Sequence, residues 1–198
     1  MTPDDVISFW FGDGGSERVK AWFKKDDVFD ARIRDRFGAA IADARDGRLD
    51  GWLDGRPEDA ARGALALVVL CDQMSRNAFR DTPDAFAADE KARAVLGRAR
   101  TAGWDELLAP LERYILYMPL MHAESREVQE DSVATFKALA DAGADLPIAD
   151  LLRSAHDYAE RHARIVERFG RYPHRNAILG RESTEQEREF LAQPGSSF

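Results

Sequence analysis

Three histidines lie in polar stretches of the sequence and could act as proton carriers: His122, His162 and His174. An unperturbed histidine titrates close to neutral pH, so its imidazole suits general acid–base catalysis. His162 falls in the middle of the apolar stripe of a predicted helix, where a lone histidine is more often a core residue than a ligand. We therefore take the three as candidate catalytic residues, and a structural role is the alternative for each.

The turn around Pro173 concentrates basic side chains in a chain that is acidic overall. Arg171 and Arg175 flank this proline, Asn176 follows, and Gly170 ends the preceding helix. A turn fixed by glycine and proline would hold the arginine forks in the geometry that a carboxylate or a phosphate requires. The turn therefore predicts binding of an anionic ligand, and the alternative is an ion pair with an acidic side chain of the same fold.

The stretch Leu65–Arg80 reads LALVVLCDQMSRNAFR and passes from an apolar helical run into a group of polar side chains. Asp72 and Arg76 are four residues apart, a spacing that lets them pair on a helix. The alternative to ligand binding is a helix end that fixes the following loop. The candidate ligand-binding residues of this stretch are Asp72, Gln73, Arg76, Asn77 and Arg80.

A further polar group follows Pro119, and its members Glu124 and Gln129 are also candidate ligand-binding residues. If the helix continues past this proline, His122 and Gln129 share one face with apolar residues, where both need partners. Glu124 is two residues from His122, so the two could share a metal only if the segment is irregular. Four side chains are of types that suit zinc: His122, Glu124, His162 and His174. Their spacing matches no known metal motif, and we expect neither a metal nor a cofactor.

The composition argues against nucleic-acid-binding and membrane-spanning proteins. The 198 residues include 28 Lys and Arg against 36 Asp and Glu, a formal net charge of -8, which argues against binding to nucleic acid. The one cysteine, Cys71, lies in an apolar run and is best read as a buried residue in a reducing compartment. The longest apolar run, Ala64–Cys71, is too short to cross a membrane, and the N-terminus does not resemble a signal peptide. We therefore predict a cytoplasmic protein without nucleic-acid or membrane partners.

Helical periodicity extends over most of the chain, and no strand pattern occurs. About eight helices joined by short loops predict one all-α domain over residues 1–198, built from antiparallel helix pairs. Pro119 is expected to break or kink the helix that contains it. Eight helices are predicted: Thr2–Phe11, a span with helical spacing between Trp22 and Ile41, a span beginning at Arg56 and Pro57, Thr82–Ala102, Trp104–Met118, Glu124–Ala142, Pro147–Phe169 and a span beginning at Ser183 and Thr184. The residues expected to be buried include Leu65, Val68, Phe79, Leu151, Ala155 and Phe169.

Four motifs together resemble a bacterial family catalogued as domain of unknown function 924: FWFG, LCDQMSRNAFR, YMPLMHAES with Gln129, and FGRYPHRNAILGRESTEQEREFL. The resemblance covers nearly the whole chain and implies an all-helical, tetratricopeptide-like array, without an established activity. Met74 and Ser75 stand where the family pattern has Phe-Pro, and Ala78 replaces a larger apolar residue. The motif positions correspond here to Asp72, Gln73, Arg76, Asn77, Arg80, His122, Glu124, Gln129, His162, Arg168, Arg171, His174, Arg175 and Asn176.

The leading interpretation is a helical domain in which all four polar stretches meet in one pocket for a small anionic ligand. If the protein is an enzyme, hydrolysis or acid–base chemistry is the expected class. The rival interpretation is a non-enzymatic helical-repeat module that binds a protein or peptide segment in a groove. The sequence leaves open whether a reaction takes place.

Overall fold

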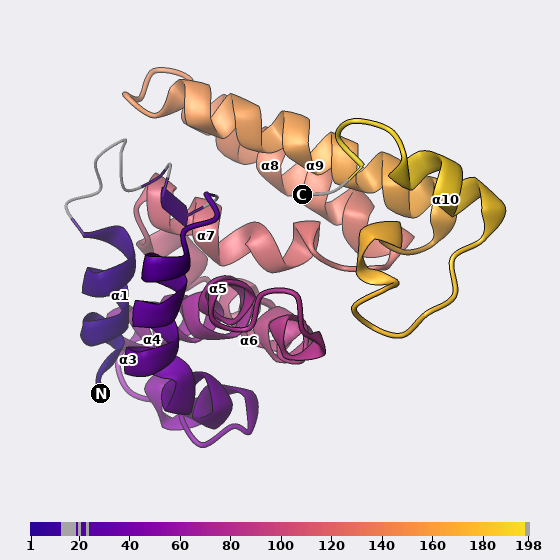
Figure 1. Ribbon diagram of the computed structural model, residues 1–198. Helices are drawn as coiled ribbons and strands as arrows, with labels where there is room; N and C mark the ends of the chain where they lie inside the picture. The colour runs from indigo at the N-terminus through magenta and orange to yellow at the C-terminus, as the bar shows by residue number, and fades with distance from the viewer. Residues whose placement is uncertain (13–18, 20, 23, 197–198) are drawn as a thin grey trace. The chain divides into compact units, whose positions relative to one another are not determined.

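The computed structural model describes residues 1–12, 19, 21–22 and 24–196. These residues form α-helices, short 3-10 helices and one π-helical segment, and none of them lies in a strand (Figure 1). This confirms the prediction of an all-α protein. The tetratricopeptide-like arrangement stays a prediction.

The chain divides into two compact units. Unit 1 comprises Met1–Arg80 and Asp84–Pro119, and unit 2 comprises Asp81–Pro83 and Leu120–Phe198. The single domain over residues 1–198 stays a proposal.

Two helices of unit 1, α1 (Pro3–Phe11) and α3 (Asp27–Arg45), begin at side-chain caps. Thr2 caps the first helix and forms a reciprocal capping box with Asp5, and Asp26 accepts hydrogen bonds from two N–H groups at the start of the next long helix. The α-helices are α1 (Pro3–Phe11), α3 (Asp27–Arg45), α4 (Pro57–Val68), α5 (Ser75–Ala78), α6 (Asp89–Thr101) and α7 (Pro110–Met121), the last of which continues into unit 2. Short 3-10 helices cover Asp50–Leu53, Pro83–Ala85 and Asp105–Leu107.

An aromatic cluster anchors α1 to α3. The rings of Phe9 and Phe37 lie 4.7 Å apart, and those of Phe9 and Phe29 stack at 5.9 Å. Trp10 is fully buried, and its carbonyl accepts a 2.9 Å hydrogen bond from the indole of Trp22. The aromatic residues near the N-terminus are therefore core anchors, because such rings bury large apolar areas.

The helix that leads to the first polar stretch is not a regular α-helix throughout. Val69–Met74 forms a π-helical turn between α4 and α5, and all six of its residues are buried. A π-turn inserts an extra residue into the helix and so rotates the following side chains relative to the preceding ones. Asp72 and Gln73 therefore occupy faces that a continuous α-helix would not give them.

Unit 2 is organised by a helical hairpin. α8 (Arg126–Ala142) and α9 (Ala149–Phe169) pack side by side, as Figure 1 shows. Gly170 ends α9 with a φ of 71°, the left-handed conformation that favours glycine. A short 3-10 helix (Pro173–Arg175) follows, and then α10 (Glu185–Leu191). Thr184 and Glu187 form the capping box that their spacing predicts.

Several predicted helix boundaries were wrong. The helix predicted over Trp104–Met118 begins only at Pro110, after a 3-10 helix over Asp105–Leu107. Pro119 lies inside α7, which runs on to Met121, because so close to a helix end the proline removes one hydrogen bond without interrupting many turns. The predicted helix Thr82–Ala102 instead begins with a 3-10 turn, and α6 starts only at Asp89. Of the six residues expected in the core, three are buried and three are half-buried; the buried ones are Leu65, Val68 and Ala155, and the half-buried ones are Phe79, Leu151 and Phe169.

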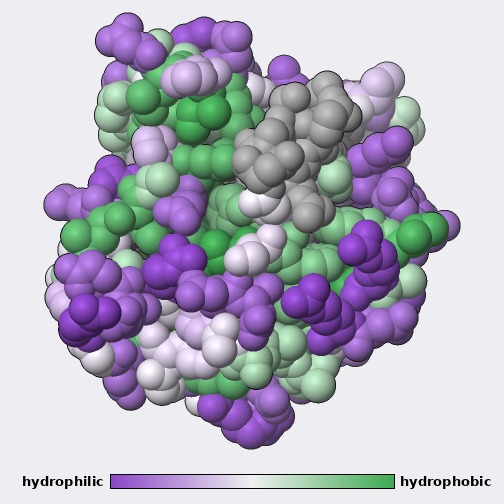
Figure 2. All heavy atoms as spheres, turned by 90° about the vertical axis from the view of Figure 1, so that its left-hand side faces the viewer, coloured by the Kyte–Doolittle hydropathy of each residue, from purple (hydrophilic) through white to green (hydrophobic). Residues whose placement is uncertain are grey.

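Surface polarity follows the amphipathic pattern of the helices. The lower part of the face in Figure 2 shows hydrophilic side chains along its edge and hydrophobic ones gathered toward the middle of the view. Among the described helices, none is long and apolar enough to pass through a membrane.

Candidate functional site

Tyr172 is the centre of the polar group in unit 2. It is fully buried and uses all of its polar atoms. Its hydroxyl donates to the carbonyl of Met121 at 2.6 Å and accepts from Nε2 of Gln129 at 2.9 Å. Its backbone N–H donates to Oε1 of Glu124 at 2.8 Å, and its carbonyl accepts from Arg181 at 3.2 Å. Tyr172 thus joins the end of α7, the start of α8 and the loop after α9.

Three imidazoles and one guanidinium gather about Tyr172. The Arg175 guanidinium lies over the Tyr172 ring, 4.6 Å from its centroid. The His162 and His174 rings are each 5.6 Å from the Tyr172 ring, and His162 and His122 are 6.3 Å apart. Arg175 also donates to the carbonyl of His122 at 3.0 Å. Three of the four predicted polar stretches therefore meet within unit 2.

Each of the two carboxylates in this group is held by an arginine. Arg181 makes a bidentate ion pair with Glu124 at 2.6 and 2.9 Å, and Arg171 makes one with Glu187 at 2.7 and 2.8 Å. Burial alone would raise the pKa of Glu124, but the hydrogen bonds from Arg181 and from the Tyr172 N–H together hold it below its ordinary value. The hydrogen bond from Arg171 lowers the pKa of Glu187 to about 2. Arg171 thus forms an ion pair with an acidic side chain of the same fold, which was the alternative to binding an anionic ligand.

His162 is neutral in this environment. Its side chain is buried, and Nδ1 lies 2.8 Å from the carbonyl of Tyr158. Because a carbonyl can only accept, Nδ1 carries the proton and the lone pair is on Nε2. Burial lowers the pKa of His162 to about 3, and the electrostatic influence of His122, His174 and Arg175 acts in the same direction.

Gln129 positions the segment that carries His122. Its Nε2 lies 2.8 to 3.2 Å from the carbonyls of Leu120, Met121 and Ala123, at the end of α7. The condition under which His122 and Gln129 would share one helix face is not met, because α7 ends at Met121 and α8 begins at Arg126. Gln129 reaches back from α8 to hold the irregular turn between the two helices.

The fourth stretch lies in unit 1, where its polar groups have partners. Arg76 makes a bidentate ion pair with Asp89 at 2.8 and 3.1 Å and lies 3.6 Å from Asp72. Arg80 makes a bidentate pair with the buried Asp30 at 2.8 and 3.2 Å. Two amides complete the group: Asn77 donates to Asp30 at 2.8 Å, and Gln73 donates to Asp72 at 2.6 Å. These contacts match the alternative to ligand binding, in which the polar side chains fix the structure around the helix end. The convergence of all four stretches in one pocket stays a prediction.

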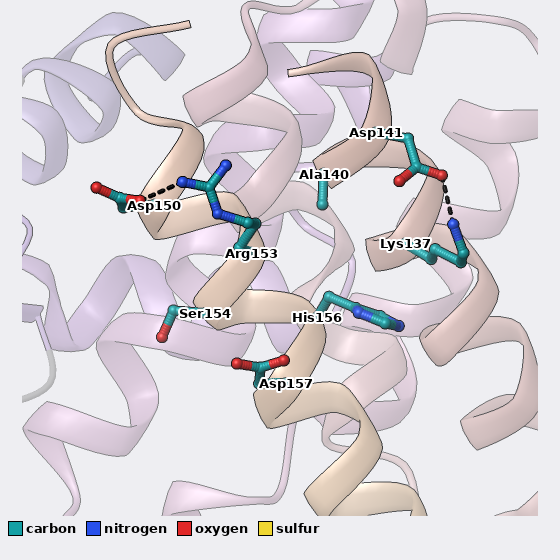
Figure 3. A pocket seen from close by; sticks show the side chains of 8 residues that line it. All are labelled: Lys137, Ala140, Asp141, Asp150, Arg153, Ser154, His156 and Asp157. Atoms are coloured by element: carbon teal, nitrogen blue, oxygen red, sulfur yellow. Dashed lines mark hydrogen bonds and ion pairs between the residues drawn. The ribbon is translucent and has the colours of Figure 1, made fainter. Parts of the chain in front are cut away.

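A surface depression of about 410 Å³ lies between α8 and α9, away from the predicted residues (Figure 3). Within it, Lys137 pairs with Asp141 at 2.6 Å, and Arg153 pairs with Asp150. His156 points toward α8. Charges of both signs line this depression, so it does not resemble the anion pocket expected from the sequence.

Among the residues that the structure describes, no three His, Cys, Asp or Glu side chains are arranged to hold a metal ion. The segment after Pro119 is irregular, as a shared site of His122 and Glu124 would require, but Glu124 instead binds Arg181. Sequence reasoning missed Tyr172, Arg181, Asp30, Asp89 and Glu187 as members of the polar groups. Tyr172 and Arg181 lie within the last family motif, and that motif could have pointed to them.

The fold and the polar group define an all-helical protein whose second unit holds a buried histidine–arginine–tyrosine cluster. The chain belongs to the family described as bacterial protein of unknown function (DUF924), which it matches over residues 6–195. It is also similar to a solved structure of a protein of unknown function from Agrobacterium tumefaciens, with 37% identity, 96% of each chain covered and a TM-score of 0.74. No curated protein matches the chain.

Proposed function

We propose that unit 2 binds a small anion, a phosphate or carboxylate group, beside Tyr172. The observation that carries this proposal is the grouping of His122, His174 and Arg175 about the Tyr172 ring. Arg181 and Arg171 already neutralise the negative charges of Glu124 and Glu187. The positive charge of Arg175 is therefore not cancelled by these two carboxylates. A local positive field in a partly buried site attracts an anion even when the net charge of the whole chain is negative.

The members of the site would have different tasks. Arg175 would supply a planar fork for two anion oxygens, and His122 and His174, both half-buried, would donate from the solvent side. His162, with a pKa of about 3, would remain neutral and support the ring of Tyr172. The predicted roles of Asn176 and of Asp72, Gln73, Arg76, Asn77 and Arg80 in ligand binding stay predictions.

If the protein is an enzyme, His122 and His174 are the proton carriers that we favour. A group with a pKa of about 3 is protonated in about one molecule in ten thousand at pH 7, so His162 is a poor proton donor at neutral pH. Hydrolysis or general acid–base catalysis on a phosphate- or carboxylate-bearing substrate is the proposed class of reaction. The protein would be cytoplasmic, as its reduced cysteine and composition predict.

A thermal-shift assay with inorganic phosphate against chloride at equal ionic strength tests the proposal. Phosphate is expected to raise the melting temperature of the unmodified protein, and Arg175→Ala and His162→Ala are each expected to abolish the increase. Arg164→Ala is the matched control, because Arg164 is exposed on α9 and contacts Glu160 one turn back, at 3.2 Å to its carbonyl and 3.4 Å to its carboxylate. Far-ultraviolet circular dichroism of each variant without phosphate separates loss of binding from loss of folding.

If the unmodified protein gains no stability from phosphate or from small carboxylates, the anion site is ruled out. The non-enzymatic helical-repeat module that binds a protein or peptide segment would then be the better interpretation. The cluster around Tyr172 would in that case serve to hold α7, α8 and the loop after α9 together.

A further inference from the structure

Two polar atoms on one face of α8 are buried without a hydrogen-bond partner: Oε1 of Gln129 and Oγ of Ser132. Gln129 is 2% exposed and Ser132 is 0% exposed. Residues three apart on a helix lie on the same face, so the two side chains start from neighbouring positions on α8. A buried polar group without a partner destabilises a protein, and such groups in native structures are usually satisfied by an ordered water.

The orientation of the Gln129 amide is fixed by its surroundings. Nε2 faces the carbonyls of Leu120, Met121 and Ala123, which can only accept. Rotating the amide by half a turn would place its oxygen against these three carbonyl oxygens. Oε1 must therefore point away from the end of α7, toward a donor that the protein itself does not supply.

Ser132 differs from other helical hydroxyl residues of this chain. Ser75 donates to the carbonyl of Cys71 at 2.6 Å, and Thr101 donates to the carbonyl of Gly97 at 2.9 Å, each four residues back. This back-bonding is the usual way for a serine or threonine inside a helix to satisfy its hydroxyl. Ser132 does not use it, although its side chain is completely buried.

We propose that Gln129 and Ser132 together bind one buried water molecule. The water would donate a hydrogen to Oε1 of Gln129 and accept the hydroxyl hydrogen of Ser132. Its second hydrogen would be available to an acceptor on the facing helix α9. A water with two or three such bonds would satisfy both protein atoms. Gln129 also donates to the Tyr172 hydroxyl at 2.9 Å, so the water site adjoins the proposed anion site, whereas Ser132 takes no part in that site.

A crystal structure at a resolution that shows ordered water is the first test. One peak within hydrogen-bond distance of both Gln129 Oε1 and Ser132 Oγ is the expected result. No peak at that position, or a Ser132 hydroxyl turned to bond the carbonyl of Val128, would overturn the proposal.

The sign of a stability change gives an independent test. Ser132→Ala removes a hydrogen-bond partner of the water, so its melting temperature should be lower than that of Ser154→Ala. Ser154 is an exposed serine on α9, and its substitution measures the gain that comes from the better helix propensity of alanine alone. If the hydroxyl were instead truly unsatisfied, removing it would stabilise the protein at least as much as Ser154→Ala. That result would contradict the proposal even if both variants fold normally.

Discussion

Burial keeps the imidazole of His162 neutral in the folded protein, with a pKa of about 3, against an ordinary value of 6.5. Between these two values the unfolded chain binds a proton that the folded chain excludes, so acid favours unfolding. The lowered pKa values of Glu124 and Glu187 also cause stability to be lost in acid, but only as the pH falls below their ordinary value of 4.5. The window between pH 6.5 and 4.5 therefore reports on His162 separately from these two carboxylates.

We expect the free energy of unfolding to fall by about 2 kcal/mol from pH 7 to pH 5 through His162 alone. His162→Gln should reduce this loss, because glutamine does not titrate, although it will also lower stability at pH 7. Urea unfolding at the two pH values measures the difference. His156→Gln is the control, since His156 lies on the same helix at the surface depression, and it should keep the full loss. Equal pH dependence in both variants would show that His162 is not the titrating group.

At the residue scale, sequence reasoning located polar groups but not their partners. The spacing of Asp72 and Arg76 predicted a helical pair, yet the closer partner of Arg76 is Asp89. Glu124 and Arg181 are 57 residues apart, and Asp30 and Arg80 are 50 apart. Such pairs depend on how helices pack, and the periodicity of one segment carries no information about that.

At the scale of single elements, local rules predicted helix ends well where side chains act within one turn. Thr184 with Glu187 forms the expected capping box, and Gly170 ends α9. The π-turn Val69–Met74 was not predicted, because its residues have the same apolar pattern as an α-helix. The rotation that the π-turn introduces depends on tertiary packing. The sequence could therefore identify Asp72 and Gln73 as polar candidates but could not predict the direction of their side chains.

Gly63 shows how the packing of two elements constrains one residue. A Cβ built at Gly63 in α4 would lie 1.9 Å from the carbonyl oxygen of Trp52, in the 3-10 helix Asp50–Leu53. Backbone cannot rotate aside as a side chain can, so Gly63→Ala must separate the two elements. We expect a loss of about 1–3 kcal/mol in the free energy of unfolding, typical of overpacking.

Gly97→Ala is the matched comparison for this prediction. Gly97 is exposed inside α6, and a Cβ there would meet no atom within 4 Å. Alanine is the better helix former, so this substitution should raise the free energy of unfolding by about 0.5–1 kcal/mol. Denaturant titration of both variants should give shifts of opposite sign, and a neutral or stabilising Gly63→Ala would contradict the close approach of α4 to Trp52.

At the scale of the whole molecule, composition predicted the class of protein but not its division into two compact units. Apolar helices follow one another without a change of composition, and Pro119, at the boundary between the units, lies inside α7 rather than in a linker. A boundary inside a helix leaves none of the signals, such as glycine-rich or charged loops, by which domains are recognised in a sequence. The proposal of one domain over residues 1–198 therefore needs a measurement of cooperativity.

The positions of the tryptophans allow the cooperativity of unfolding to be measured by fluorescence. All four tryptophans lie in unit 1: Trp10, Trp22, Trp52 and Trp104. Tryptophan fluorescence therefore reports on unit 1, while far-ultraviolet circular dichroism reports on the helices of both units. If the chain unfolds as one domain, the two signals should change at the same urea concentration.

A substitution confined to unit 2 makes the test stricter. Tyr172→Phe removes the hydroxyl that donates to Met121 and accepts from Gln129, so it should cost about 1–2 kcal/mol. In one cooperative domain this loss will shift the tryptophan transition of unit 1 as far as the dichroism transition. Tyr158→Phe, at an exposed tyrosine of α9, should shift neither. If Tyr172→Phe shifts the dichroism transition and leaves the tryptophan transition in place, the two units unfold independently, and residues 1–198 form two domains rather than one.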